Sequence, residues 1–586
     1  MLLVGVFFIV AGVNAGLYHQ LHHAHSRWHR VAAETPGALT LTASLTRTAF
    51  IVIGLLLLLL CHGLLRRKHR AWQATMALLV TAAALNVVRL HRHIDRFGLS
   101  AMVTGFAITA VLVGLGLYYR REFYALGDPR TRWRALGILI ALIGADLAIG
   151  LLYIAMRGLT RPYTFPERVQ AVLYGLVGAS PPVPVHFVQD IRGDFFALLT
   201  GALGIITVLV TAYLFVRPAE PQGRLGEQDA QRIRQLLARH GDADSLGYFA
   251  LRDDKSVVWS PTGKSCIGYR VLSGVMLASG DPLGDPEAWP GAIHEFLDMA
   301  AAHAWVPAVI GCSELGAEIW CREGGLTALE LGDEAVVQVA DFTLDGRQMR
   351  NVRQMVTRVR RAGYVAQVRR VRDVPPEEVA RLVRQADTWR GSATERGFSM
   401  ALGRIGGPGD GDCVIATATQ DGVLRALLHF VPWGHDGLSL DLMRRDRSAQ
   451  PGLNDFMIVE TIRAAPGIGV KRVSLNFAMF RAALERGERI GAGPILRAWR
   501  RVLVFLSRWF QIESLYRFNA KFGPQWVPRF LVFTGPRDAI RIGLAALEAE
   551  AFLVWPTMEA RRLARKARGR LRRWRAAHAA GPARPG

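Results

Sequence analysis

The chain has 586 residues, of which 51% are hydrophobic and 20% charged, and its mean hydropathy is above zero. Lysine and arginine number 72 against 48 aspartates and glutamates, so the formal net charge is +24. The length exceeds that of one domain, and the apolar content excludes a disordered chain and an ordinary soluble enzyme. Five scattered cysteines form no C-x-x-C pair and no zinc spacing, so we expect neither a disulfide scaffold nor a metal site.

Long apolar runs fill residues 1–217. A helix needs ~20 residues to cross a hydrocarbon core of ~30 Å. The sequence therefore predicts a polytopic α-helical membrane domain of about six transmembrane helices, near 1–17, 48–64, 71–90, 98–118, 133–156 and 195–216. A seventh stretch, 169–179, is too short to cross, and we expect it to be re-entrant or interfacial. Asp146 lies within the fifth run, where a charge is costly and usually faces a partner or a cavity.

Basic residues indicate the orientation of these helices. Arg66–Arg70 follows the second run, and five arginines between 120 and 134 follow the fourth. The positive-inside bias places both loops, and everything after 217, in the cytosol, although Arg92 and Arg96 of the third loop weaken the pattern. We therefore predict a multi-pass protein of the cell (cytoplasmic) membrane with cytosolic C-terminal domains.

The part after residue 217 has mixed α/β character. A linker rich in proline and glycine at 217–226 and a second break at 372–376 separate two similar successions of helices and strands. They predict two α/β domains, 218–372 and 373–555. Helices are expected near 226–240, 287–303, 347–362, 377–389 and 453–464. Strands are expected near 257–260, 266–271, 306–310, 336–339, 364–368, 412–418, 423–431, 437–442 and 471–476, with Pro307 indicating an edge strand.

Two segments are strongly basic. The helix 347–362 has arginines on one side, apolar residues on the other and no acid after residue 346. A solvated surface helix would explain this pattern, but a phosphate-rich partner is favoured. The basic tail 556–586 has nine basic residues between 561 and 575, and it fits anionic lipid or RNA equally well.

The densest polar group lies in the second α/β domain. A strand carries Asp441 and runs into Arg444 and Arg445. A carboxylate followed by guanidiniums can orient a nucleophile or an amino group while the cations hold an anion, although a local ion pair at a strand end explains it equally well. Asn476 ends another strand. Asn454–Asp455 is expected to cap the helix that carries Glu460.

Glycine-rich segments give weaker signals. Gly280–Pro286 is either a backbone cradle for an anion or a tight turn, and the turn is favoured. Arg489–Gly493 is only a weak likeness to the pyrophosphate loop of acetyltransferases. Because the sequence has no Walker loop and no strand-linked G-x-G-x-x-G, nucleotide hydrolysis and dinucleotide redox chemistry are disfavoured, and we expect no cofactor.

Several motifs in order resemble a known family. Its first half is matched by Gly280–Pro282, Leu331–Ala335, Asn351–Arg353 and Arg361–Tyr364, and its second by Glu395–Ser399, Asp441–Arg444 and Phe518–Arg529. This is the phosphatidylglycerol lysyltransferase, or multiple peptide resistance factor, family, whose members join a multi-helix membrane domain to two tandem acetyltransferase-like (GNAT) folds. The likeness covers about 240–535. Segments 474–481 and 507–516 look most like the branch of the family that carries a fused lysyl-tRNA synthetase. We recognise no synthetase in this sequence, so we expect a separate synthetase to supply the charged tRNA.

The resemblance implies transfer of an aminoacyl group, most simply lysyl, from aminoacyl-tRNA to phosphatidylglycerol. Asp441 would orient the amino group or hydroxyl, and Arg444 would lie near the lipid phosphate or oxyanion, with Asn476 also catalytic. Glu395 would pair with a lysyl ammonium. The expected substrate-binding residues are Glu395, Arg445, Glu460, Tyr516, Lys521 and Arg529. The residues expected to steer tRNA are Arg347, Arg350, Arg353, Arg358 and Arg361.

Departures from the family leave alternatives open. Asn476–Phe477 stands where many relatives have glycine, and Phe530 where many have tyrosine. Another amino acid, another acceptor lipid, a cell-wall precursor, or a flippase or scaffold without enzymatic activity therefore stay open, as does a homo-oligomer.

Overall fold

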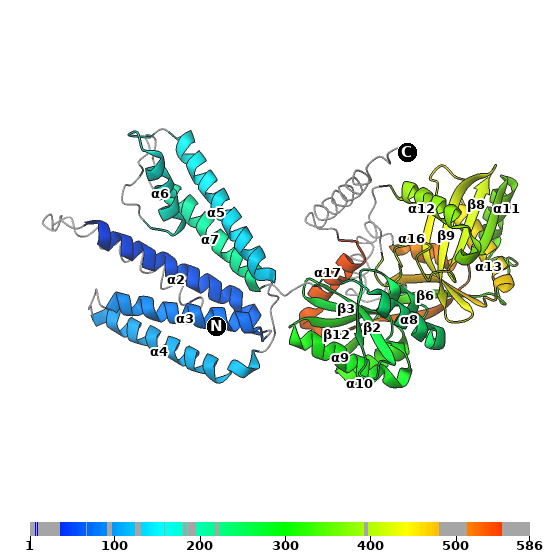
Figure 1. Ribbon diagram of the computed structural model, residues 1–586, viewed down its shortest axis with the longest axis horizontal. Coiled ribbons are helices and arrows are strands. Elements are labelled where there is room, and N and C mark those ends of the chain that lie inside the picture. The colour runs from blue at the N-terminus through cyan, green and yellow to red at the C-terminus, as the bar shows by residue number, and fades with distance from the viewer. Residues whose placement is uncertain are drawn as a thin grey trace, which may run out of the picture. The chain divides into compact units, whose positions relative to one another are not determined.

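The structure is a computed structural model of the chain (Figure 1). It describes residues 36–65, 67–90, 96–123, 130–157, 159–179, 195–216, 223–391, 397–479 and 512–553, with single residues 6, 9, 185 and 221. Two compact units divide the chain near residue 219. Glu395, the segment 489–493 and the tail 556–586 lie outside the described residues, so expectations about them stay predictions.

The first unit is helical. Its elements are α2 (Pro36–Leu65), α3 (His69–Leu90), α4 (Arg96–Tyr118), α5 (Arg130–Met156), α6 (Phe165–Leu176) and α7 (Phe195–Val216). Among the described residues, three segments are long and apolar enough to cross a membrane: Thr48–Leu65, Ala135–Met156 and Phe195–Phe215. Large apolar side chains on α5 and α7, such as Ile140, Leu152 and Leu198, are more than half exposed, as expected of helices that face lipid. The count of about six crossings stays a prediction.

Close packing joins α6 to the spanning helices. At 12 residues α6 is too short to cross, and Thr164 N at its start donates to Glu167 Oε2 at 2.7 Å. Gly204 of α7 lets the backbones approach, because a Cβ there would lie 1.9 Å from the Leu176 carbonyl oxygen. The buried Asp146 of α5 accepts a hydrogen bond from Thr207 Oγ1 of α7 at 2.7 Å, so its predicted partner lies on a neighbouring helix.

The second unit is built on one mixed sheet (Figure 1). Among the described residues its order is β1-β2-β3-β5-β12-β6-β11-β10-β9-β8-β7, and β4 pairs with β2. The strands are β1 (Ser256–Trp259), β2 (Ser265–Leu272), β3 (Val275–Ser279), β4 (Leu283–Gly284), β5 (Val306–Cys312), β6 (Thr327–Gln338), β7 (Tyr364–Arg370), β8 (Val414–Gln420), β9 (Val423–Trp433), β10 (Gly437–Arg445), β11 (Arg472–Met479) and β12 (Gln525–Phe533).

Helices cover both faces of this sheet. They are α8 (Glu227–His240), α9 (Trp289–Ala302), α10 (Glu314–Gly324), α11 (Arg350–Arg361), α12 (Pro376–Arg390), α13 (Leu453–Ala464), α16 (Ile512–Ala520) and α17 (Ala539–Ala549). In the first half of this unit, built on β1–β6, α9 and α10 pack on one face of the sheet and α17 on the other, because alternate residues of β3 and β5 enter different cores. In the second half of this unit, built on β7–β11, α11 and α13 cover one face of the sheet and α12 the other.

The end of the chain folds back into the first half. Strand β12 lies between β5 and β6 and is antiparallel to both, and β6 also pairs with β11 of the second half. Conversely, α11 and β7 precede the predicted boundary at 372 but pack with the second half: β7 pairs with β8, and Val356 of α11 shares a core with Phe430. Contacts therefore cross that boundary, and both halves share one sheet.

The prediction that 306–310 forms an edge strand is wrong. Strand β5 lies inside the sheet, between β3 and β12. Pairing with β12 reaches only to Ala308, so the missing N–H of Pro307 falls just outside that ladder. Proline is therefore tolerated at the beginning of an internal strand.

Candidate active site

Asp441 lies at an irregularity of β10. The pairing of β10 with β9 shifts between Leu440 and Leu442, so Asp441 is the extra residue of a β-bulge. Its side chain is only 4% exposed. The carboxylate accepts two hydrogen bonds of 2.6 Å, from His429 Nδ1 to Oδ2 and from the backbone N–H of Leu402 to Oδ1. Each oxygen retains a lone pair for a further donor.

His429 is fully buried beside this carboxylate. Burial works to lower the pKa of His429, but the hydrogen bond with Asp441 and the contact with Cys413 outweigh it and raise the pKa to about 10. His429 is therefore an imidazolium at neutral pH. Sequence analysis missed His429, because a lone histidine in an apolar strand forms no pattern.

The loop 397–402 fixes Asp441 from the other side. Arg252, which follows the short helix Gly247–Leu251, donates Nη1 to two carbonyl oxygens of this loop, at 2.5 and 3.0 Å. Glu550, just after α17, accepts from the backbone N–H groups of Phe398 at 2.8 Å and Ser399 at 3.0 Å. The first half and the C-terminal helix thus both hold the loop that donates to Asp441.

Strands β10 and β11 separate next to this carboxylate. Their parallel pairing runs only to Ser439 and Ser474. Beyond it, the bulge lets Asp441 reach His429 on the face that Leu442 also shares, and alternation from Leu442 places Arg444 on this face, opposite Leu427. Asn476 of β11 has φ +72°, and its buried Oδ1 accepts no hydrogen bond from the described residues. A strained residue with an unsatisfied buried oxygen is typical of a functional site.

Two other predicted site residues, Lys521 and Tyr516, have identified partners. Lys521 Nζ contacts Asp455 Oδ1 at 3.0 Å, and the Tyr516 ring lies 5.4 Å from the Trp526 ring. The prediction that Asn454–Asp455 caps α13 is wrong, because the N-cap is Gly452, at φ +91°. Asp455 lies in the first turn, where a carboxylate is favourable, and pairs with Lys521 instead.

Two substrate-binding predictions find no support in the geometry. Glu460 Oε1 is engaged by Arg360 at 2.7 Å and Arg463 at 3.2 Å, where α11 meets α13. That face of the sheet is opposite to the one that carries Asp441. Arg445 ends β10 and is half-buried.

The arginines expected to steer tRNA lie on α11 and in the turn before it. All five are exposed: Arg347, Arg350, Arg353, Arg358 and Arg361. Arg353 Nη1 donates to the carbonyl oxygens of Leu344 at 2.5 Å and Gly346 at 3.5 Å. The other four present their guanidiniums to solvent.

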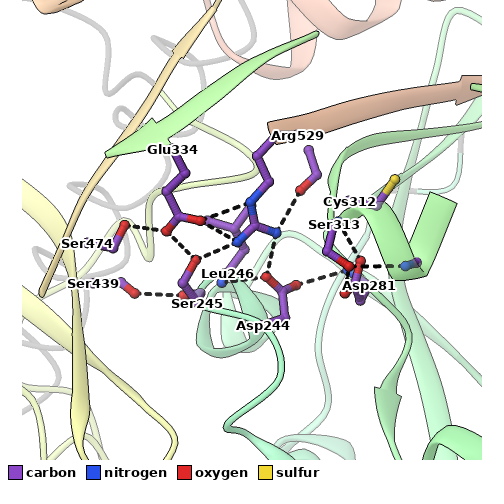
Figure 2. A network of polar contacts seen from close by, with 12 residues as sticks. Asp244, Ser245, Leu246, Asp281, Cys312, Ser313, Glu334, Ser439, Ser474 and Arg529 are labelled. Carbon is purple, nitrogen blue, oxygen red and sulfur yellow. Dashed lines mark hydrogen bonds and ion pairs between the residues drawn. The ribbon is translucent and has the colours of Figure 1, made fainter. Parts of the chain in front are cut away.

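Arg529 lies at the centre of a buried network (Figure 2). Its guanidinium donates Nε and Nη2 to Glu334 Oε2 at 3.0 and 2.5 Å, and Nη1 to Asp244 Oδ1 at 2.8 Å. The remaining N–H groups reach Ser245 Oγ at 2.7 Å and the Gly311 carbonyl oxygen at 3.3 Å. All five donors are occupied, so Arg529 has none left for a lipid phosphate.

In the first half, the network continues from Asp244 to Asp281 and Ser313. Asp281 accepts from Ser313 N at 2.8 Å and Ser313 Oγ at 2.6 Å, and its own N–H donates to Asp244. Burial and the neighbouring Asp244 carboxylate raise the pKa of Asp281, against the opposing effects of Arg529 and Ser313. Gly280–Pro286 therefore holds a buried carboxylate and does not form a cradle for an anion.

Serines connect this network to the end of the β10–β11 pairing. Ser474 Oγ donates to Glu334, and Ser439 Oγ donates to the Ser245 carbonyl oxygen at 2.7 Å (Figure 2). These two serines are the last paired residues of β11 and β10. The network thus fixes the point at which the strands separate beside Asp441.

A buried lysine supports the loop 397–402. Lys255 Nζ donates to Ser279 Oγ at 2.6 Å and lies 4.6 Å from the centre of the Phe398 ring. Burial and the nearby Arg252 lower the pKa of Lys255 to about 7, although Asp254 and Glu550 act in the opposite direction. Sequence analysis did not identify this residue.

The fold and the site define a membrane protein with an α/β unit that holds a buried carboxylate–imidazolium pair where its central strands separate. Residues 234–533 match the family described as phosphatidylglycerol lysyltransferase, C-terminal, and residues 4–215 match the transmembrane region of lysyl-tRNA synthetase. The chain belongs to the phosphatidylglycerol lysyltransferase family, which confirms the family predicted from the motifs.

Relatives extend the likeness to both units. The chain is 45% identical over 507 residues to the lysylphosphatidylglycerol biosynthesis bifunctional protein LysX of Rhodococcus opacus, covering 86% of this chain and 44% of that protein. It is 44% identical over 511 residues to LysX of Mycobacterium avium, covering 85% and 42%. The chain thus spans less than half the length of these relatives. The structure of L-PGS from Bacillus licheniformis is 21% identical and covers 57% of this chain and 99% of its own, with a TM-score of 0.47.

Proposed function

We propose that this chain transfers an aminoacyl group, most simply lysyl, from aminoacyl-tRNA to a glycerol hydroxyl of phosphatidylglycerol at the cytosolic face of the membrane. The observation that carries the proposal is the buried, doubly hydrogen-bonded carboxylate of Asp441, three residues before Arg444, where β10 and β11 separate. Membership of the family and the names of the relatives support it.

The chemistry suits these residues. One ester replaces another, so the reaction needs positioning and charge stabilisation but no nucleotide hydrolysis. Because one Asp441 oxygen is engaged by His429 and the other by the Leu402 N–H, Asp441 is well suited to bind the amino group or orient the hydroxyl. Arg444 would stabilise the oxyanion or the lipid phosphate. Asn476, with its free Oδ1, would accept a hydrogen bond from substrate.

Arg529 has a different role in this proposal. Because its guanidinium is saturated, it would hold β10, β11 and β12 in place and would not contact substrate. Lys521, only partly buried beside Asp455, is the cation better placed to meet an anionic substrate.

The membrane part would cross the bilayer about six times, with the C-terminal unit cytosolic. Three segments predicted on the cytosolic side lie together: Arg67 Nη1 is 3.2 Å from Glu122 Oε2, and the Arg70 guanidinium is 5.6 Å from the Phe215 ring. At the start of the apolar segment Thr48–Leu65 within α2, Thr48 Oγ1 donates to the Gly178 carbonyl oxygen at 3.4 Å. The product would carry net positive charge, lower the negative surface potential of the membrane and weaken the binding of cationic peptides.

The test is the lipid extract of cells that express the chain, analysed by mass spectrometry. Wild type should yield a new aminoacyl-phosphatidylglycerol, and Asp441→Asn should lower it at least ~100-fold, because the substrate loses a charged hydrogen-bond partner in a buried site. Asp421→Asn, the same change in an exposed turn at φ +53°, is the control and should keep full activity. Full product with Asp441→Asn would contradict the assigned role. No product from wild type, with charged tRNA present, would favour a flippase or scaffold.

A further inference from the structure

A hollow of about 290 Å³ opens on the first half of the second unit, between α8 and the turn that joins β1 to β2. Its lining includes Arg232 and Arg239 of α8 and Lys264 of the turn. All three side chains are exposed, and none forms an ion pair with a carboxylate among the described residues. Asp285 is the single acidic residue in the described lining, and its Oδ1 accepts from the Glu287 N–H at 3.1 Å. The hollow is therefore strongly electropositive.

One of these cations is held in place by an aromatic ring. The Arg232 guanidinium carbon lies 3.7 Å from the centre of the Trp259 ring, which is a stacking distance. The Trp259 indole N–H donates to Asp229 Oδ1 at 3.0 Å and so fixes the ring. Gly263, at φ +68°, leaves room beside the guanidinium, since a Cβ there would come within 3.0 Å of Arg232 Nη2. A stacked guanidinium loses less freedom when its N–H edge binds an anion.

The position of the cations argues against a purely structural role. Arg239 and His240 lie in the last turn of α8, where positive side chains are favourable beside the helix carbonyls. That preference explains neither Arg232, in the middle of the helix, nor Lys264, in the turn. An anion bound among these three exposed cations would relieve their mutual repulsion.

We propose that this hollow binds backbone phosphates of the tRNA. The inference rests on the proposed function, in which an aminoacyl-tRNA is the donor. A lipid would need apolar surface for its acyl chains, and the described lining offers only Leu236 and Trp259. The hollow lies beside the C-terminal turn of α8, so helix N–H groups do not contribute and the cationic side chains carry the binding. Such contacts are independent of base sequence and sensitive to salt.

The hollow is also connected to the candidate active site. The buried face of α8, with Ala230 and Ile233, packs in one core with Leu402, the residue whose N–H donates to Asp441. The helix that presents the cations therefore packs against the loop that positions the carboxylate. A tRNA bound at the hollow would contact α8, and its aminoacyl end would meet Asp441, which the loop packed against α8 holds in place.

The experiment is a direct binding measurement without lipid or turnover. The purified full chain in detergent is titrated against a fluorescent lysine tRNA transcript, and anisotropy is followed at several salt concentrations. The double variant Arg232→Glu/Lys264→Glu should raise Kd ~10-fold or more and reduce the slope of log Kd against log salt by about 1–2. The control Arg381→Glu/Arg384→Glu makes the same charge change at exposed positions of α12 and should leave Kd within about twofold of wild type.

A second double variant with milder substitutions controls for misfolding. Arg232→Gln/Lys264→Gln should weaken binding in the same direction by a smaller factor, with an unchanged melting temperature. Equal Kd values for the hollow and control variants would overturn the proposal. So would a hollow variant that keeps its tRNA affinity but loses binding to phosphatidylglycerol vesicles. Failure of the proposed function is recognised separately, because a wild type that makes no aminoacyl lipid can still be tested for RNA binding.

Discussion

Lys255 shows how one buried charge can connect stability to pH. It is fully buried, its one hydrogen bond among the described residues is to Ser279, and its pKa is lowered to about 7 from the usual 10.5. Between these two values the unfolded chain binds a proton that the folded chain does not, so folding becomes more favourable as pH rises. Below pH 7 both states are protonated, and the folded state bears the full cost of the buried charge.

We therefore expect Lys255→Met to raise the melting temperature of the full chain relative to wild type. The difference should be largest, about several degrees, at pH 7 and below, and it should shrink progressively towards pH 10.5. Scanning fluorimetry in detergent across this range measures it. Lys264→Met, at an exposed position, is the control and should show no such trend. A gain that is independent of pH would mean that Lys255 is not the titrating group.

Arg529 shows why a motif does not reveal the role of its residues. The motif and its aromatic neighbours predict a cation for substrate, whereas the structure surrounds it with Glu334, Asp244 and Ser245. Three buried carboxylates, including that of Asp281, share this one guanidinium. Such a network gives little net stability, but removing one partner would leave uncompensated charge in the core. Its position among β12, β6 and β11 is the basis of the structural role proposed for it above.

At the scale of elements, the loop 397–402 and the end of α17 act together on Asp441. Glu550→Gln removes the charge and one acceptor from the carboxylate that holds the N–H groups of Phe398 and Ser399. The loop should loosen, and the hydrogen bond from Leu402 to Asp441 should weaken with it. We expect kcat for aminoacyl transfer to fall ~10-fold while the KM for tRNA changes little.

The neighbouring Glu548 offers a matched control for this prediction. Its Oε2 accepts from Ser273 Oγ at 3.1 Å, whereas the loop N–H groups of Phe398 and Ser399 donate to Glu550. Glu548→Gln should leave kcat within about twofold of wild type. A fall in kcat that is equal for both variants would indicate a general loss of packing around α17 and not a positioning role of Glu550.

Periodicity predicted many of these elements, because local patterns are enough for amphipathic helices such as α8, α11 and α12 and for strands such as β8 and β9. It did not predict β12, since Pro528 and Arg529 interrupt the apolar pattern of the strand, and its partners β5 and β6 are about 200 residues away in the sequence. The bulge at Asp441 and the pair with His429 were equally hidden, because they depend on register between strands. The motif singled out Asp441, but its surroundings follow from non-local contacts.

At the scale of the whole molecule, the orientation is a prediction from the charge pattern, by which we expect the ends of α2, α4 and α7 in the cytosol. The contacts of Arg67 with Glu122 and of Arg70 with Phe215 bring those ends together, as a common side of the membrane requires. The segment around Pro162, between α5 and α6, is then expected outside. Because aminoacyl-tRNA is cytosolic, this orientation is the one that the proposed reaction requires.

Cysteines introduced at two exposed positions test this orientation. Tyr119→Cys, after α4, should resist a membrane-impermeant maleimide in intact cells, and Pro162→Cys should react. Both should react after lysis, and the chain without the added cysteines gives the background from its native thiols, of which Cys61 and Cys321 are partly exposed. Reaction at position 119 in intact cells, with protection at 162, would invert the topology. The carboxylate of Asp441 would then face away from its donor, and the proposed transfer would be impossible.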